Sequence, residues 1–200
     1  MKRFLHVGCG PKRKDETTPA FNTPEWEEVR FDIDETVAPD IVGTMLDMSS
    51  VPAASFDAIF SSHNLEHLNA HEVKPALEEF RRVLRKDGFV VITCPDLQTV
   101  CALVAQDKLL DPAYVAPAAG PITPLDIIYG HRASLMQGHW YMAHRCGFTQ
   151  RVLNATLTQA GFGGVVSMRR ERAFDLWAVA TVEEMPDDEL RALAIAHFPR

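Results

Sequence analysis

Short apolar runs bounded by polar residues dominate the first half of the chain. They predict buried strands at residues 4–7, 29–33, 40–45, 56–61 and 89–95. Between the last two runs, apolar residues recur at helical spacing from Val73 to Leu84, which predicts a helix that Gly88 ends. Continuous apolar strands alternating with helical segments indicate a mainly parallel sheet covered on both faces.

Two segments depart from this alternation. Residues 11–25 carry prolines among charged residues and threonines, so we expect a loop there rather than a full helix. Residues 107–147 contain four prolines and are too long for an ordinary connection; segments of this kind are usually lids or binding loops. We therefore expect a single domain over residues 1–200 with a lid-like insertion at about 107–147.

Regular patterns return after the insertion. A helix is expected at residues 149–162, where Thr149 can cap its first turn. Two apolar strands follow at residues 165–170 and 175–182, and an acidic segment at residues 186–198 predicts a closing helix.

Composition narrows the classes of partner. The formal charge of −7 and the pI of about 5.6 argue against nucleic acid as a partner, because proteins that bind it concentrate positive charge. No apolar run approaches the roughly 20 residues of a membrane helix. The cysteines are scattered without a Cys-x-x-Cys pair, and no apolar signal segment is evident at the front of the chain, so we expect reduced thiols in a cytoplasmic protein.

A glycine turn marks the first candidate site. Gly8, Cys9 and Gly10 follow the first strand and Asp32 lies at the end of the second, where open α/β sheets bind their ligands. An acid at this position can accept both ribose hydroxyls. Lys12 stands in place of the last glycine of a dinucleotide motif, and no clean helix N-terminus follows to hold a phosphate. A nucleoside without pyrophosphate is therefore expected, which favours S-adenosylmethionine over a nicotinamide cofactor.

Five segments in order carry a resemblance to a known family: "LHVGCG", "VRFDIDE", "LDMSSVPAASFDAIFSSHNLEHL", "VLRKDGFVVITCPDL" and "CGFTQRVLNATLTQAGF". Together they resemble the class I S-adenosylmethionine-dependent methyltransferases, in particular the short bacterial, methyltransferase type 11-like group. The resemblance covers roughly residues 3–100 and 145–182. It implies a Rossmann-like seven-stranded mainly parallel sheet with helices on both faces and an antiparallel last strand.

The resemblance also implies roles for individual cofactor-binding residues. Gly8, Cys9 and Gly10 would lie under the methionine part of S-adenosylmethionine, with Asp32 on the ribose and Ile33 against the adenine. Asp47 would accept from the adenine amino group, and the Met48 N–H would face a ring nitrogen. An alternative register puts Thr44 and Met45 in those two places. Ser62 and His63 would border the methyl group and the incoming substrate.

The segment "SSHNLEHLNAH" supplies the candidate catalytic residues. His63 and His67 are placed to act as a base toward the acceptor or to contact it, since histidine titrates near neutral pH. On a helix, His63, His67 and His71 would form one stripe, a spacing that can bind a metal. The family pattern "LEHL" occurs without metal, so we expect no metal here. Histidines and aromatic residues of the insertion either close over the substrate or form a structural flap (His131, His139, Trp140, Tyr141, His144).

One departure from the family pattern precedes the turn. His6 stands where many members have an acid, and we interpret it as a strand residue packed against the sheet. The sequence thus predicts methyl transfer from S-adenosylmethionine to a small-molecule or carrier-linked acceptor, such as a saccharide. A homodimer is one assembly that this interpretation allows. The alternative function is a non-catalytic methyltransferase-like protein that serves in binding or assembly.

Overall fold

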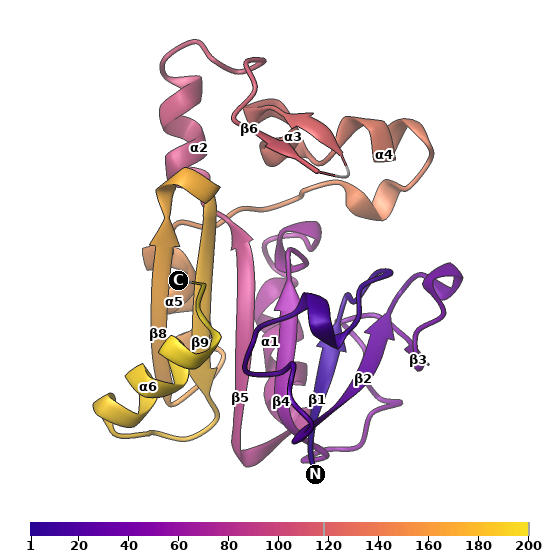
Figure 1. Ribbon diagram of the computed structural model, residues 1–200, viewed down its shortest axis with the longest axis vertical. Helices are drawn as coiled ribbons and strands as arrows, with labels where there is room; N and C mark the ends of the chain where they lie inside the picture. Colours follow the sequence, from indigo (N-terminus) through magenta and orange to yellow (C-terminus); the bar gives the residue numbers. More distant parts are fainter. Residues whose placement is uncertain (118, 200) are drawn as a thin grey trace.

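A seven-stranded sheet forms the centre of the computed structural model, which describes residues 1–117 and 119–199 (Figure 1). Its strands run in the order β3-β2-β1-β4-β5-β9-β8. The first five pair in parallel, whereas β9 is antiparallel to both β5 and β8. The predicted sheet with its antiparallel last strand is therefore confirmed. The bounds are β1 Lys2–Val7, β2 Trp26–Asp32, β3 Ile41–Val42, β4 Phe56–Ser62, β5 Leu84–Pro95, β8 Gly164–Arg170 and β9 Asp175–Thr181.

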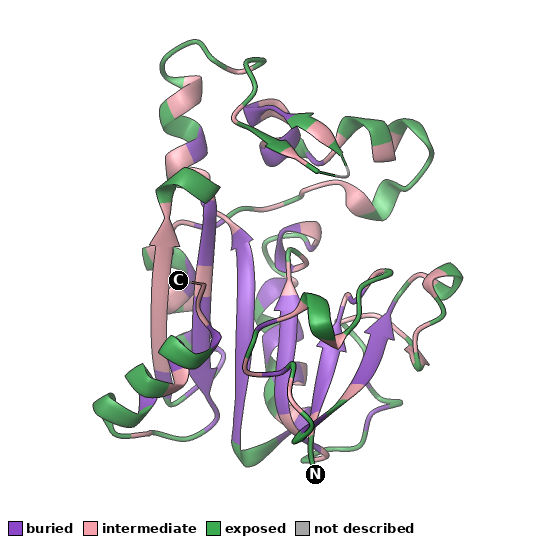
Figure 2. Cartoon of the chain, in the orientation of Figure 1, coloured by how far each residue is buried: buried purple, intermediate pink, exposed green. Residues whose placement is uncertain are grey.

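Helices cover both faces of this sheet, as predicted. On one face, α1 (Val73–Val83) and α5 (Gln150–Gln159) pack against alternate residues of the central strands. On the other face, α6 (Asp187–His197) contributes Leu190 and Ala194 to a second cluster (Figure 1). Buried residues run through the central strands β1, β2, β4, β5 and β9, which places the core on both sides of them (Figure 2).

Residues 11–25 form a loop, as predicted, with only a short 3-10 helix at Lys14–Glu16. The loop delivers Phe21 to the second face, where its ring stacks on Phe4 at 4.3 Å between centroids. The same ring lies 4.5 Å from the imidazole of His197 at the end of α6. A buried aromatic side chain and a helix from late in the chain therefore cover this face of the sheet around Phe4.

Two predicted element boundaries are corrected. Helix α1 ends at Val83 rather than at Gly88, because Leu84 already pairs with Phe56 as the first residue of a long β5. The strand expected at residues 40–45 shortens to β3, Ile41–Val42. The chain turns directly afterwards, since the Asp47 N–H donates to the Thr44 carbonyl across 3.1 Å.

The insertion lies across the carboxyl edge of the sheet (Figure 1). It is preceded by α2 (Leu97–Val104), a helix that the sequence interpretation missed and that Asp96 caps. The insertion itself contains a hairpin of β6 (Tyr114–Ala116) and β7 (Gly120–Ile122), then α3 (Pro124–Tyr129), α4 (Arg132–Met136) and a short 3-10 helix at Trp140–Met142. Val100, Ile122 and Ile127 form a small buried cluster that joins α2 to the insertion. Among the helices of the described chain, we find none with the length and apolar character needed to cross a membrane.

Candidate active site

The glycine turn after β1 is shaped by positive backbone angles. Gly8 and Gly10 have φ values of +63° and +53°, a region that residues with a side chain rarely adopt. A Cβ atom on Gly8 would lie 2.0 Å from Asn64 Oδ1, so glycine is required there on spatial grounds as well. Asn64 Nδ2 donates to the Val7 carbonyl across 2.9 Å. This bond holds the turn against the segment that follows β4.

A buried arginine stabilises the glycine turn and the loop that follows it. The side chain of Arg30 on β2 is almost fully buried, and its guanidinium donates to main-chain carbonyls alone. Nε donates to Lys12 O (3.2 Å) and Nη1 to Ala38 O (2.7 Å), while Nη2 donates to the carbonyls of Gly10 and Val37. Arg30 is not among the residues that the sequence interpretation identifies. The signal for it in the sequence is a charged residue within the apolar run of a predicted strand. Arg30 fixes the loop that stands in place of the usual first helix.

Asp32 joins the ends of the first two strands. Asp32 is buried, at 8% exposed, with Oδ2 accepting from the Gly10 N–H (2.7 Å) and Oδ1 from the Asp34 N–H (2.9 Å). A carboxylate offers about four acceptor positions, so further hydrogen bonds to ribose hydroxyls remain open. The next side chain, Ile33, is 58% exposed beside it. An exposed apolar side chain at this place is suited to packing against an adenine ring.

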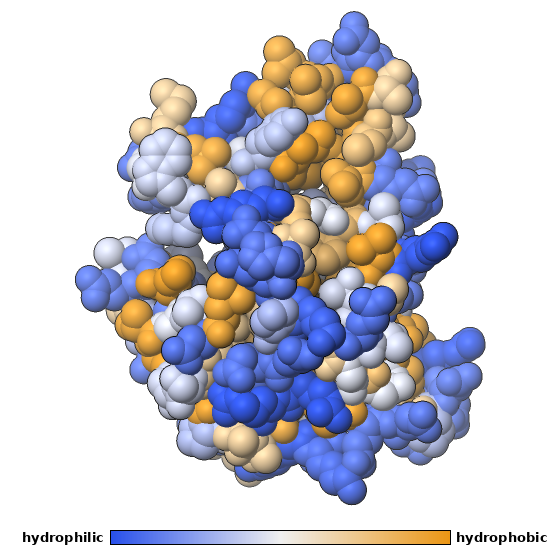
Figure 3. All heavy atoms as spheres, turned by 180° about the vertical axis from the view of Figure 1, so that it is seen from behind, coloured by the Kyte–Doolittle hydropathy of each residue, from blue (hydrophilic) through white to orange (hydrophobic). Residues whose placement is uncertain are grey.

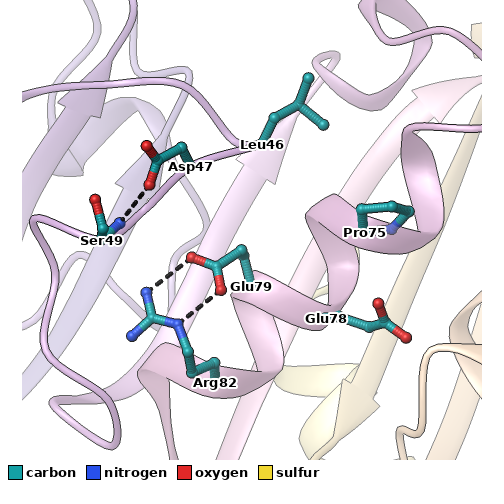
Figure 4. Close-up of a pocket in the computed structure, with 7 residues that line it drawn as sticks. All are labelled: Leu46, Asp47, Ser49, Pro75, Glu78, Glu79 and Arg82. Carbon is teal, nitrogen blue, oxygen red and sulfur yellow. Dashed lines mark hydrogen bonds and ion pairs between the residues drawn. The ribbon is translucent and has the colours of Figure 1, made fainter.

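The predicted contact of the Met48 N–H with adenine is corrected by the structure. This N–H donates to Glu79 Oε2 on α1 across 3.1 Å, and the Met48 side chain is fully buried. Figure 4 shows Glu79 paired with Arg82, which also donates through Nη1 to the Val51 carbonyl (3.0 Å) and clamps the loop against the helix. Met48 is therefore directed to α1 rather than to the carboxyl edge of the sheet.

Asp47 lies in the same loop, with Oδ1 accepting from the Ser49 N–H at 3.0 Å (Figure 4). Hydrogen bonds from Ser49 hold the pKa of Asp47 below its usual value. In the alternative register, Thr44 directly follows Gly43, whose N–H donates to the Asp32 carbonyl across 2.9 Å. Thr44 and Met45 are therefore next to the end of β2, where the adenine contact is expected.

The segment after β4 carries the candidate catalytic histidines. Ser62 ends the strand, with its Oγ 2.8 Å from Thr93 Oγ1. His63 has a φ of +57°, and its side chain is 49% exposed. Leu65–His67 form a short 3-10 helix instead of continuing as an α-helix, so His63, His67 and His71 do not share a helical stripe.

A buried glutamate lies between the histidines that the structure brings together. The side chain of Glu66 is 1% exposed, and His63 Nδ1 lies 3.4 Å from its Oε1. Burial raises the pKa of this carboxyl, but the opposing effects of His63, His67 and His144 outweigh it and leave the pKa lowered. The rings of His67 and His144 meet at 4.9 Å between centroids. Burial also lowers the pKa of His144, which favours its neutral form.

A cavity of about 480 Å³ opens beside this group. It has three walls, namely the segment after β4, the insertion and the turn between β8 and β9. The segment after β4 contributes His63 and His67. The insertion contributes Tyr114, Ile122, His131 and His144, and the turn between β8 and β9 contributes Arg170, Phe174 and Asp175. Of the insertion residues singled out from the sequence, His131 and His144 face the cavity, and Tyr141 donates to Asp34 (2.8 Å). Trp140 is 70% exposed.

Two residues at the turn have structural roles. His6 is buried, with Nδ1 2.7 Å from Glu28 Oε1 and its ring 5.3 Å from that of Phe60. This confirms the interpretation of His6 as a strand residue packed against the sheet. The Cys9 side chain is buried too, and burial raises its thiol pKa to about 11. Only the main chain of Cys9 is therefore suited to contact a ligand.

The fold and the carboxyl-edge site are those that the resemblance to class I methyltransferases implies. Residues 5–92 match the family model described as "Methyltransferase domain". No curated protein sequence matches the chain. Over residues 5–92, the match bears out the predicted resemblance to a methyltransferase domain.

Solved structures of low sequence identity share the fold. One is a SAM-dependent methyltransferase from Archaeoglobus fulgidus (TM-score 0.58, 15% identity, 90% of this chain and 86% of that chain). Another is the 1,6-didemethyltoxoflavin-N1-methyltransferase of Burkholderia thailandensis, solved with its substrate and S-adenosylhomocysteine (TM-score 0.56, 16% identity, 91% and 71%). The carbon methyltransferase domain of the citrinin polyketide synthase is also similar (TM-score 0.56, 16% identity); the match covers 92% of this chain and spans 47% of the solved one.

Proposed function

We propose that this protein transfers the methyl group of S-adenosylmethionine to a small-molecule or carrier-linked acceptor, such as a saccharide. One observation carries the proposal: a cavity of about 480 Å³ opens at the carboxyl edge of the sheet, one residue away from Asn64, which bonds to the glycine turn that the resemblance assigns to the cofactor. Asn64 links the two places, because it follows His63 of the cavity wall and bonds to the carbonyl before Gly8.

The cofactor would be held by the ends of β1, β2 and β4. The backbone of Gly8, Cys9 and Gly10 would meet its methionine end together with Ser62, while Asp32 would take the ribose and Ile33 the adenine. The fit rests on the positive φ angles of the glycine turn, on the acceptor positions that the Asp32 carboxylate has left and on the exposed Ile33. Asp47, or Thr44 and Met45 in the other register, would contact the adenine edge. S-adenosylmethionine supplies a methyl group that its positive sulfur has already activated.

The residues around the cavity would align the acceptor and exclude water. Holding two reactants in the right geometry removes much of the entropic barrier of an in-line transfer. His63 is half-exposed at the cavity wall and has Glu66 behind it, which suits a base that takes a proton from the acceptor. His67 borders the same space and would contact the acceptor.

The lining of the cavity supports a polar acceptor. Charged and polar side chains reach it from three walls, including Arg170, Arg172, Asp126 and His131. Ligand sites place such groups to fix the orientation of a bound molecule. Ile122, Ile127 and Phe174 also line the cavity, so it suits a molecule with both hydroxyl groups and an apolar face, such as a saccharide.

Hydrophobic residues gather at the end of the molecule formed by α2 and the insertion (Figure 3). Leu110 and Val115 are 62% and 70% exposed there. Exposed apolar patches commonly mark interaction sites, so this surface supports a homodimer as the assembly we propose. Sedimentation of the purified protein measures its oligomeric state and tests the proposed homodimer.

The four cysteines are free, in keeping with the proposed cytoplasmic location.

Calorimetric titration with S-adenosylmethionine and S-adenosylhomocysteine, with NAD as a control, tests the cofactor site. We expect micromolar binding of both sulfur ligands and none of NAD. Asp32→Asn removes the charge and keeps the size, and should weaken binding by at least tenfold; Asp87→Asn, at the opposite edge of the sheet, is the matched control. Unchanged binding in Asp32→Asn would place the ribose elsewhere.

Methyl transfer itself is tested with radiolabelled S-adenosylmethionine and a panel of hydroxylated acceptors. Label should appear in a polar acceptor and fall strongly with His63→Ala, while cofactor affinity is retained. If the protein binds no sulfur ligand at millimolar concentration, the non-catalytic binding or assembly function takes first place.

A further inference from the structure

Glu66 is a buried carboxylate that the described part of the chain leaves without a hydrogen bond. Its side chain is 1% exposed, and neither Oε1 nor Oε2 has a hydrogen-bond donor in the structure. His63 Nδ1 lies 3.4 Å from Oε1, without the geometry of a hydrogen bond. Burying a carboxylate in this way is costly unless a cation or several donors compensate it. The arrangement therefore points to a partner for Glu66 from outside the chain.

Two imidazoles converge on the same place with one nitrogen each already used. His67 Nδ1 lies 3.2 Å from the Ala143 carbonyl, and His144 Nδ1 lies 2.7 Å from the Ile127 carbonyl. A nitrogen that faces a carbonyl must carry the proton, so the lone pair of each ring is left on Nε2. Metal-binding histidines in proteins are oriented by this kind of bond to a backbone carbonyl.

The main chain of the insertion is fixed to the Glu66 segment at this point. The N–H of Arg145 donates to the Glu66 carbonyl (2.8 Å), and that of His144 donates to the Tyr129 carbonyl (3.2 Å). Within the insertion, a Cβ on Gly130 would lie 2.3 Å from the Met142 carbonyl, which shows how closely the parts of the insertion before and after α4 pass each other. His144 is therefore held in place by the backbone before any ligand binds.

One ligand atom from each of Glu66, His67 and His144 lies within 4.8 Å of the other two. Two imidazoles and one carboxylate are a known ligand set for zinc and other divalent transition metals, with further positions left for water or substrate. We propose that Glu66, His67 and His144 bind a divalent transition-metal ion such as Zn²⁺.

The site lies at the wall of the cavity, since all three residues line it. An open coordination position would then face the space assigned to the acceptor and would hold one of its oxygen atoms. This second step rests on the proposed function, whereas metal binding itself does not. The proposed metal site also assigns a role to the insertion, because His144 supplies the third metal ligand beside Glu66 and His67.

Zinc binding by the chelator-treated protein tests the proposal without cofactor or acceptor. We expect calorimetry to show one Zn²⁺ bound per chain with micromolar or tighter affinity. Cobalt should bind at the same place and give a visible spectrum with no thiolate charge-transfer band, since the ligands are nitrogen and oxygen. Absence of saturable binding in the wild type up to millimolar Zn²⁺ would overturn the proposal, and so would a thiolate band.

Substitutions locate the ion. Glu66→Gln and His144→Gln should each weaken zinc binding by at least about 100-fold, whereas exposed His71→Gln should not change it. Thermal unfolding followed by circular dichroism shows whether each variant is folded; if Glu66→Gln is not, His144→Gln and the wild-type cobalt spectrum still decide. Equal zinc affinity in a folded variant contradicts the assignment. A protein that binds zinc but no S-adenosylmethionine would refute the proposed function alone.

Discussion

The hydroxyl group of Tyr141 donates a hydrogen bond to Asp34 Oδ2 across 2.8 Å and so connects the insertion to the loop after β2. Three residues further on, His144 reaches the wall of the cavity. One short segment of the insertion thus contacts both the loop expected to hold the adenosine and the place expected to hold the acceptor. Hydrogen bonds from Thr36 and Tyr141 lower the pKa of Asp34, which keeps it ionised as the acceptor of this bond.

Removing this bond should loosen the insertion over the cofactor. For Tyr141→Phe we expect S-adenosylmethionine affinity to fall by about 2- to 10-fold, the usual effect of losing one hydrogen bond. Calorimetric titration of the variant measures it. Tyr129→Phe, which alters a 61% exposed tyrosine of the same insertion, is the control and should bind normally. If both variants bind like the wild type, the insertion does not cover the cofactor.

The two glycines of the turn should respond differently to alanine. Gly10→Ala meets only the unfavourable backbone angle, because no atom lies within 4 Å of the added Cβ, and should cost about 1–2 kcal/mol. Gly8→Ala also collides with Asn64 and should cost clearly more. Urea unfolding of the two variants gives the comparison. An equal loss in both would show that Asn64 moves aside without cost.

Arg30 should contribute strongly to stability. Arg30→Met leaves four carbonyls of the surrounding loops without their donor, so we expect a loss of about 3 kcal/mol or more in the free energy of unfolding. Arg30→Lys should not rescue it, because one ammonium group cannot reach carbonyls on both loops. Denaturant unfolding measures both variants, and Arg81→Met, which removes a single exposed hydrogen bond, serves as the control.

Acid should weaken the fold through His197. Burial lowers the pKa of this residue from 6.5 to about 4, so its neutral form is favoured in the folded state. This contribution is fully present above about pH 6.5 and is lost as the pH falls toward about 4, by about 3 kcal/mol in all. The difference in unfolding free energy between wild type and His197→Phe, followed from pH 7 to pH 4, isolates it. A pH-independent difference would contradict the assignment.

The parts of the molecule that depend on short-range patterns could be predicted from sequence. Apolar runs predict where the strands lie along the chain, and glycine and proline positions predict the turn at Gly8 and the loop at residues 11–25. At Leu84 an apolar residue fits the periodicity of a helix as well as that of a strand, so the sequence pattern places it in the helix. Its pairing with Phe56 shows that it belongs to β5.

Features that depend on distant side chains could not be predicted. The Met48 N–H was expected to face adenine, but Glu79 on α1 accepts from it. The approach of His144 to Glu66 requires the path of the whole insertion, which no local pattern contains. The role of Arg30 cannot be predicted from the sequence, because its partners are backbone carbonyls, which every residue has.

The covering of the second face has a consequence for how the protein is made. Phe21 is near the front of the chain, yet it packs against α6, and Thr18 Oγ1 lies 2.8 Å from His197 Nδ1. During synthesis on the ribosome, the sheet around Phe4 must therefore wait with this face uncovered until residues 187–197 have emerged. Over that interval the nascent chain presents an aromatic surface that a chaperone is suited to shield.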